Sequence, residues 1–236
     1  MIETELLSSE TQPSQWLSNQ DWAAIQEDYC ASAPYHYTIV DNFLSPEALK
    51  LVRDGLITNK AWSYMNWQAQ ELFIRNFPFP PAQRISEEIA EKIPRILGGG
   101  LSLVQHIAFM HQRNKGLCAH SDTGQVTVNL WLTPDEYNLE PDSGGLVLYD
   151  VKRTDDQQIH EFNARPWCVD YLNAHTKGGM AVAGYKFNRA VIFDAKTFHA
   201  SDRINFRSDG AHTYRINYAF LFDKPAVFRN RYEQYI

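Results

Sequence analysis

The sequence predicts a mainly β fold with flanking helices, and two observations indicate it. Beyond about residue 100, seven short runs alternate apolar and polar residues and are separated by turn residues: LSLVQHIAFM, QVTVNLWL, GGLVLYDV, MAVAGYKF, RAVIFDA, FHASDRI and TYRINYAFLFD. No helix-length pattern lies between these runs, which favours a β-sandwich or barrel over a parallel α/β sheet. Helical spacing is found in the region before them, so we expect two helices packed on a jelly roll.

The first hundred residues are expected to support this β region. The first 35 residues are polar with interspersed Trp16, Trp22 and Ile25, which predicts a short amphipathic helix, and the strand-like run YHYTIV follows. Ser45 is suited to cap a helix whose first residue is Pro46, and this helix is expected to end near residue 56.

A second supporting helix is predicted across residues 81–97. Isoleucines recur at helical spacing there, at positions 85, 89, 93 and 96. Pro94 should end or kink this helix, because proline lacks the backbone N–H that a helix interior needs.

We expect one domain over residues 1–236, with residues 1–100 as support and 101–223 as the jelly-roll core. The segment 152–179 breaks the rhythm of short strands and is interpreted as an insertion. Long insertions in compact domains are usually lids or binding loops. We therefore expect this segment to close over the site and to contribute Trp167 or Tyr171 to a substrate wall. The segment AWSYMNWQAQELF, with Trp62, Tyr64 and Trp67, is the alternative wall.

Charge and composition argue against several classes to which the protein could belong. The chain has 22 basic and 28 acidic residues, a net charge of −6, which argues against a broad nucleic-acid surface but leaves room for a basic pocket for a small acid. No apolar run approaches the roughly 18 residues of a membrane-spanning helix. The amino terminus lacks the pattern of a signal peptide, and three scattered cysteines do not make a disulfide framework. We expect a cytoplasmic protein with no membrane or nucleic-acid partner.

The triplet His120-Ser121-Asp122 is the first candidate metal motif. In an extended chain residues i and i+2 point to the same side, so the imidazole and the carboxylate project together. His199 lies in the strand-like run FHASDRI. Two histidines and one carboxylate on a small β domain match the facial triad of non-haem Fe(II) oxygenases, which leaves coordination positions open.

The last strand-like run offers a candidate anion site. By alternation Arg215, Asn217, Ala219 and Leu221 share one face, while the greasy residues between them share the other and should pack against the helices. An arginine that points into a barrel needs an anionic partner, because a buried unpaired charge is costly. A small dicarboxylic acid suits the guanidinium fork.

Taken together, these segments resemble the Fe(II)/2-oxoglutarate-dependent oxygenases, and most closely the prolyl 4-hydroxylase-like branch. The resemblance covers about residues 36–223 and consists of TIVDNFLSPEAL, HSD at 120–122, VTVNLWLTPDE, PDSGGLVLYD, NRAVIFDAKTFHAS and RINYAFLF. It implies a double-stranded β-helix (jelly roll) and a dioxygenase that hydroxylates an unactivated C–H bond of a small molecule, amino acid or peptide. Succinate and CO2 are the implied coproducts.

The resemblance also implies a set of site residues. Fe(II) would be held by His120, Asp122 and His199, and Arg215 would bind the far carboxylate of the cosubstrate 2-oxoglutarate, with O2 as the second cosubstrate. Asn217 and Asn129 are the further candidates for cosubstrate binding. A carboxylate at position 122 favours hydroxylation or demethylation over halogenation.

Several alternatives stay open at the level of single residues. Arg203 and Arg207 also follow His199, but they precede a Ser-Asp-Gly turn and are expected to face solvent. Asn129 and Trp131 share a strand face that is either the pocket or an outer surface. Cys118 leans to the side of His120 but is expected to be a free core residue, and Gly144-Gly145 is expected to make a tight turn.

Two other classes of protein also stay open. One is a cupin-like metal protein that works without 2-oxoglutarate, which would have no use for Arg215. The other is a non-catalytic jelly-roll binding module, in which His120 and Asp122 would be incidental.

Overall fold

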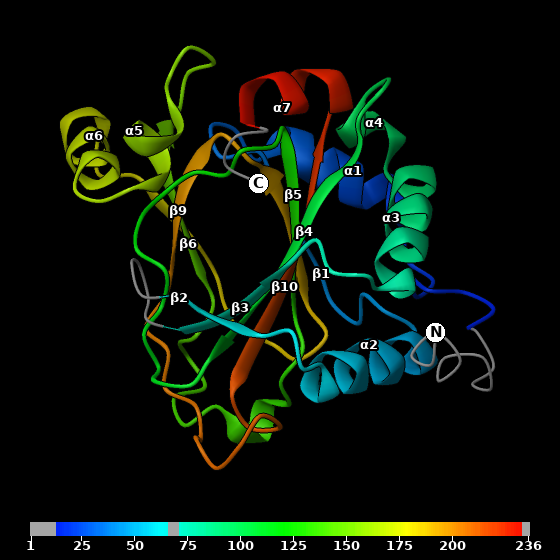
Figure 1. The fold of residues 1–236 in the computed structure, drawn as a ribbon. Helices are drawn as coiled ribbons and strands as arrows, with labels where there is room; N and C mark the ends of the chain where they lie inside the picture. The colour runs from blue at the N-terminus through cyan, green and yellow to red at the C-terminus, as the bar shows by residue number, and fades with distance from the viewer. Residues whose placement is uncertain (1–12, 66–70, 233–236) are drawn as a thin grey trace.

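Two antiparallel sheets form the body of the protein in the computed structural model, which describes residues 13–65 and 71–232 (Figure 1). The large sheet has seven strands in the order β1-β8-β5-β10-β4-β3-β2, and the small sheet has three in the order β7-β6-β9. The strands are β1 Tyr37–Val40, β2 Ser63–Met65, β3 Glu71–Arg75, β4 Ser102–His111, β5 Val126–Trp131, β6 Leu146–Lys152, β7 Met180–Ala183, β8 Ala190–Asp194, β9 Thr197–Ser201 and β10 Arg215–Asp223. All seven predicted runs beyond residue 100 are strands, so the mainly β jelly roll is confirmed.

Helices flank the two sheets. They are α1 Trp22–Ala31, α2 Pro46–Thr58, α3 Pro80–Lys92, α4 Pro94–Leu97, α5 Ile159–Asn163, α6 Trp167–His175 and α7 Pro225–Tyr232, with a 3-10 turn at Asp135–Tyr137. The Ser45 hydroxyl accepts a hydrogen bond from the Ala48 N–H and caps α2, as predicted. The predicted helix over 81–97 is two helices, because Pro94 starts a new one after Ile93.

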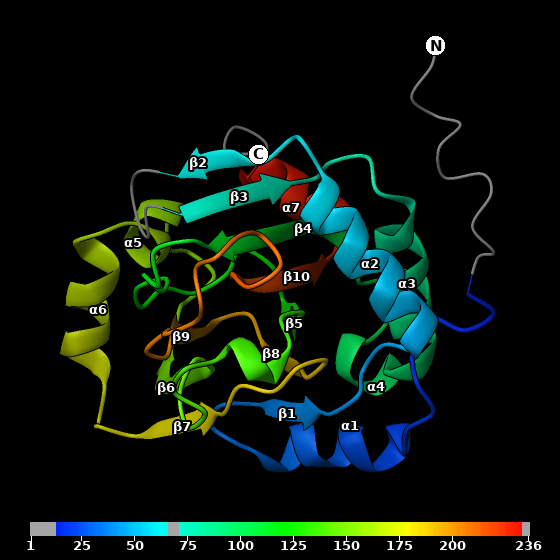
Figure 2. The ribbon, with the colours of Figure 1, turned by 90° about the horizontal axis from the view of Figure 1, so that it is seen from below.

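The large sheet has one face on the helices and one on the small sheet. On β10 the outward residues Ile216, Tyr218 and Phe220 lie in one buried cluster with residues of α2 and α3. Figure 2 shows α2 and α3 on the side of this sheet away from β6, β7 and β9. The residues that alternate with these on β10, Arg215, Asn217, Ala219 and Leu221, therefore face the space between the sheets.

The insertion 152–179 connects β6 to β7. It contains helices α5 and α6, which were not predicted because no helix-length pattern was found between the strand-like runs. Phe162 and Cys168 from these helices are fully buried with Phe198 of β9. This cluster fixes the insertion against the small sheet (Figure 1). The short strands β2 and β3 and the last helix α7 were also not predicted.

None of the helices in the described residues is long and apolar enough to cross a membrane. The expectation that the whole chain is one domain stays a prediction.

Candidate metal centre

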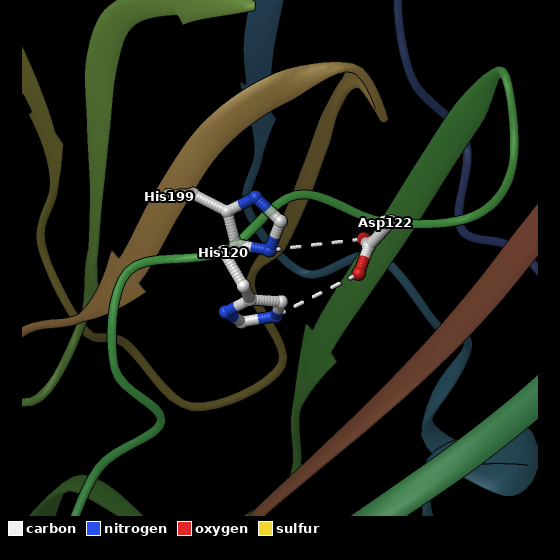
Figure 3. A group of neighbouring side chains, drawn as sticks. All are labelled: His120, Asp122 and His199. Atoms are coloured by element: carbon white, nitrogen blue, oxygen red, sulfur yellow. Dashed lines mark ion pairs between the residues drawn. The ribbon is translucent and has the colours of Figure 1, made fainter. Parts of the chain in front are cut away.

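The three predicted metal ligands come together at one point between the sheets (Figure 3). One ligand atom from each of His120, Asp122 and His199 lies within 4.8 Å of the other two. His120 Nε2 is 3.8 Å from Asp122 Oδ1, and His199 Nε2 is 3.7 Å from Asp122 Oδ2. The spacing is close enough for a single ion to meet all three side chains.

Backbone pairing explains why residues so distant in sequence meet. His120 and His199 exchange two backbone hydrogen bonds of 2.9 and 2.7 Å, so the segment before β5 joins β9 through an isolated antiparallel bridge. The Asp122 N–H bonds to the Ala195 carbonyl at 2.9 Å and continues this pairing. The alternation expected for an extended HxD segment then places the carboxylate on the side of both imidazoles.

Each histidine is oriented by the carbonyl two residues before it. His120 Nδ1 lies 2.7 Å from the Cys118 carbonyl, and His199 Nδ1 lies 2.9 Å from the Thr197 carbonyl. A carbonyl can only accept, so each Nδ1 carries the proton and each Nε2 presents a lone pair to the centre. Burial lowers the pKa of His120, which favours its neutral, ligating form.

Asp122 is held by two residues that sequence reasoning did not single out for this role. The Thr127 hydroxyl donates to Asp122 Oδ2 at 2.7 Å. Arg153, only 3% exposed, donates to the carbonyls of Asp122 at 2.9 Å, Thr123 at 3.4 Å and Gly124 at 2.8 Å. Its guanidinium also lies 4.9 Å from the Phe162 ring. Hydrogen bonds of this kind orient metal ligands.

The centre opens into a cavity of about 350 Å³ between the two sheets. The inward faces of β4, β5 and β10 line it, together with residues of β2, β3, β8, α5 and α7. This volume is in the range of small-molecule sites. Arg215, Asn217 and Asn129 all line it, as predicted from strand alternation.

Arg215 is 2% exposed and is surrounded by neutral partners. Its Nε donates to the Gly144 carbonyl at 2.7 Å, and Nη2 donates to the Gly145 carbonyl at 3.3 Å. The Trp131 and Tyr185 rings lie 5.7 and 5.8 Å from its guanidinium carbon. Within residues 13–65 and 71–232 no carboxylate forms an ion pair with it, and burial lowers the pKa of Arg215 to about 10. The site thus supplies a buried positive charge.

The two candidate asparagines form a network with Arg215. Asn217 Oδ1 accepts from Arg215 Nη1 at 3.2 Å and lies 3.0 Å from His111 Nε2. Asn217 Nδ2 donates to Asn129 Oδ1 at 3.1 Å. His111 is 1% exposed, and its link to Asn217 comes from strand pairing, which its sequence position does not reveal.

Other single-residue expectations have clear outcomes. The Arg203 and Arg207 side chains are 73% and 52% exposed and pair with Glu140 and Asp209, so both face solvent as predicted. Trp131 is fully buried and stacks on the Tyr185 ring, which excludes the outer-surface alternative. Gly144 adopts φ +89°, as expected for a turn.

The expected substrate wall is wrong in its residues. Trp167 is 53% exposed and contacts His160, while Tyr171 stacks on Phe198, and neither lines the cavity. An aromatic residue on a short helix can serve packing or solvent as readily as a pocket, and the sequence does not separate these roles. The insertion instead contributes Ile159, His160, Asn163 and Ala164 of α5 and the turn after it.

The alternative wall is partly correct. Met65 and Phe73 from that segment line the cavity. Trp62 donates to the Leu56 carbonyl, Tyr64 is 47% exposed, and Trp67 lies outside the described residues.

Comparison with known proteins places this site in a familiar scaffold. No family model and no curated protein sequence matches the chain. Among solved structures, the non-heme α-ketoglutarate-dependent carbocyclase SnoK from nogalamycin biosynthesis has a TM-score of 0.60 at 12% identity, covering 96% of this chain and 94% of that one. A prolyl hydroxylase from Trichoplax adhaerens, in complex with a peptide of hypoxia inducible factor, has a TM-score of 0.56 at 14% identity, covering 89% and 97%. HygX from Streptomyces hygroscopicus, with nickel and 2-oxoglutarate bound, has 0.57 at 8%, covering 87% of each chain. The chain therefore has the jelly-roll fold of the 2-oxoglutarate- and Fe(II)-dependent oxygenases.

Proposed function

We propose that this protein is a non-haem Fe(II)- and 2-oxoglutarate-dependent dioxygenase that hydroxylates an unactivated C–H bond. The observation that carries the proposal is the sharing of one cavity by a His-Asp-His cluster and a buried arginine whose partners among the described residues are all neutral. The first feature suits a metal ion with open positions, and the second suits a carboxylate.

The donor set fits Fe(II). Two imidazole nitrogens and one carboxylate make up the facial triad of this chemistry. The Nε2 atoms of His120 and His199 carry no proton, because each Nδ1 faces a carbonyl. Asp122 Oδ2 accepts from Thr127, which leaves Oδ1 as the carboxylate oxygen available to an ion.

Arg215 fits the far carboxylate of 2-oxoglutarate. Its backbone partners at Gly144 and Gly145 fix the guanidinium, and no carboxylate in the described part of the chain pairs with its charge. The Asn217 carbonyl accepts from Arg215 Nη1, so Asn217 acts mainly by orienting Arg215. In the described residues Asn129 receives a bond from Asn217 and no bond from its own amide nitrogen appears, so this nitrogen is suited to donate to the cosubstrate.

The bound ion and cosubstrate would supply oxidation of a C–H bond by O2, with 2-oxoglutarate converted to succinate and CO2. The chain provides the surroundings for that reaction. Leu146, Phe193, Ala219 and Leu221 give part of the cavity wall an apolar surface. Arg153 and Thr127 hold the Asp122 loop in place while substrates enter and leave.

The test is an anaerobic titration of the purified protein with Fe(II) and 2-oxoglutarate, watching for the weak visible metal-to-ligand absorption. We expect the absorption in the native protein and its loss in His120→Ala, Asp122→Ala and His199→Ala. His175→Ala, a change at an exposed histidine of α6, should keep it.

The rival functions give different results in this titration. Metal binding without the absorption would favour a cupin-like protein that works without 2-oxoglutarate. Failure to bind metal at all would favour a non-catalytic binding module.

Peptides and small molecules both remain candidate substrates, as the neighbouring enzymes illustrate. We also propose that the chain works as a single oxygenase domain. A cytoplasmic location stays a prediction.

A further inference from the structure

Gln105 is a buried polar residue that faces the cavity from β4. It is 7% exposed and lines the cavity together with Ile107 and Phe109, which share its face of the strand. Among the residues that the structure describes, none forms a hydrogen bond with the side-chain amide of Gln105. In the same part of the chain, the unpaired polar atoms that are fully enclosed belong to other residues, so both atoms of this amide are open to the cavity. Buried polar groups are almost always hydrogen-bonded, so an unpaired amide that opens into a cavity indicates a ligand that pairs with it.

Gln105 lies on the side of the metal centre and away from the cosubstrate anchor. It pairs with Leu221 of β10, and Leu221 pairs with Thr127 of β5, which places Gln105 and Thr127 about 10 Å apart. The Thr127 hydroxyl donates to Asp122 at 2.7 Å. Arg215 pairs with position 111 of β4, six residues or about 20 Å along the strand from Gln105. A carboxylate bound at Arg215 cannot reach Gln105, which is therefore placed for a group of the substrate held beside the metal.

Uncharged groups accompany Gln105 at this end of the cavity. Thr123 of the Asp122 loop and Tyr232 of α7 line the cavity and carry hydroxyl groups. Tyr232 lies in a cluster with Val104, the chain neighbour of Gln105. Arg75 of β3 lines the cavity as well, but it already has an interaction within the chain. A neutral polar group suits this surface better than an ion does, because an unpaired charge is costly to bury.

The chemistry of the Gln105 amide limits the groups that can pair with both of its atoms. Its nitrogen donates and its oxygen accepts. A second amide satisfies both atoms through two parallel hydrogen bonds when its own N–H and C=O point to the same side. A primary carboxamide and a ring amide have this shape, whereas a carboxylate or an ester can only accept.

We propose that Gln105 binds an amide group of the substrate, and that the substrate is a small molecule with an apolar body and a primary carboxamide or ring amide. This inference rests on the proposed function, since it takes Arg215 and the metal to be occupied by 2-oxoglutarate. The apolar body follows from neighbours such as Ile107 and Phe109, and the size follows from the cavity, because about 350 Å³ must hold both molecules.

The binding test uses the full chain loaded with Ni(II), which permits binding without turnover, and saturating 2-oxoglutarate. The probes are linear and aromatic primary carboxamides of four to ten carbons, each paired with its methyl ester, which keeps the carbonyl and loses the N–H. Calorimetry measures their dissociation constants. We expect at least one carboxamide to bind about 3- to 10-fold more tightly than its ester, the difference that one neutral hydrogen bond provides.

A variant assigns that preference to Gln105. Gln105→Met keeps the length of the side chain and removes both hydrogen-bonding atoms, so it should bring the ratio of the two dissociation constants close to one. Binding of 2-oxoglutarate should be unchanged. Gln83→Met, the same change at an exposed glutamine of α3, should behave as the native protein.

Urea unfolding of the ligand-free protein separates a binding role from a structural one. A glutamine that holds the fold together would lower the urea midpoint when it is replaced. Because no partner of the Gln105 amide is found in the described chain, we expect Gln105→Met to keep the native midpoint or to raise it.

The outcomes also separate the inference from the function on which it rests. If no carboxamide binds better than its ester while 2-oxoglutarate binds normally, or if Gln105→Met lowers the urea midpoint, the assignment of Gln105 is wrong and the proposed function stands. If Gln105→Met weakens 2-oxoglutarate binding, Gln105 contacts the cosubstrate and the inference is overturned. If the native Ni(II) protein does not bind 2-oxoglutarate, the proposed function fails and the inference fails with it.

Discussion

Arg153 makes the sharpest test of how the Asp122 loop is held. The change is Arg153→Met, which keeps the apolar stem beside Phe162 and removes every hydrogen-bond donor. Two short bonds to the carbonyls of Asp122 and Gly124 are lost, and each bond to a charged donor contributes roughly 1.5–3 kcal/mol. Removing a buried charge also removes its desolvation cost, so we expect the free energy of unfolding to fall by about 3 kcal/mol, the lower end of that sum.

The same change should loosen the metal. Loss of a hydrogen bond that orients a ligand typically costs about 10- to 100-fold in metal affinity, and Arg153 acts on the backbone of Asp122 itself. Urea unfolding of the metal-free protein and a metal titration measure the two effects separately. Arg231→Met is the matched control, because Arg231 meets the exposed Asp155 at 3.4 Å and lies away from the loop. Native stability and native metal affinity in Arg153→Met would refute the reasoning.

Three further predictions concern the cosubstrate anchor, the glycine pair and pH. Arg215→Gln should raise the 2-oxoglutarate concentration needed for half-saturation by about 10- to 100-fold with metal affinity kept, and Arg207→Gln should match the native protein in the same titration. Gly145→Ala places a Cβ 2.0 Å from a backbone oxygen and should lower the free energy of unfolding by more than about 2 kcal/mol. Gly99→Ala, with open space around it, should not lower it by that amount. Burial lowers the pKa of His106 from 6.5 to about 4, so between these pH values the unfolded chain binds a proton that the folded chain excludes. The contribution of His106 to the free energy of unfolding should therefore be complete above pH 6.5 and decline towards pH 4. In urea unfolding, His106→Gln should reduce that decline. If the pH profile of His106→Gln matched that of the native protein, His106 would not be the source of the decline.

The strands and the faces of the last strand could be predicted because they depend on local alternation. Arg215 and Asn217 face the cavity and Ile216 and Tyr218 face the helices, as a period of two requires. The HxD spacing likewise predicts that His120 and Asp122 project together, a consequence of chain geometry alone.

The residues that sequence reasoning missed act through partners that are distant along the chain. Arg153 holds carbonyls about thirty residues away, and Arg75 reaches the cavity only because β3 pairs with β4. Nothing in the neighbouring sequence of either residue indicates these partners. The insertion shows the opposite problem. Trp167 is of a residue type that often lines a pocket, but its side chain faces solvent.

The pairing of His120 with His199 has a consequence for the order of folding events. The two imidazoles are 199 − 120 = 79 residues apart, and they meet only after β9 and the segment beside it have found each other. Closing so long a loop is slow compared with forming local contacts, so the ligand set is completed late. An ion that binds a late-formed site stabilises the native state without stabilising the transition state. Metal should therefore slow unfolding in stopped-flow experiments and leave the refolding rate nearly unchanged.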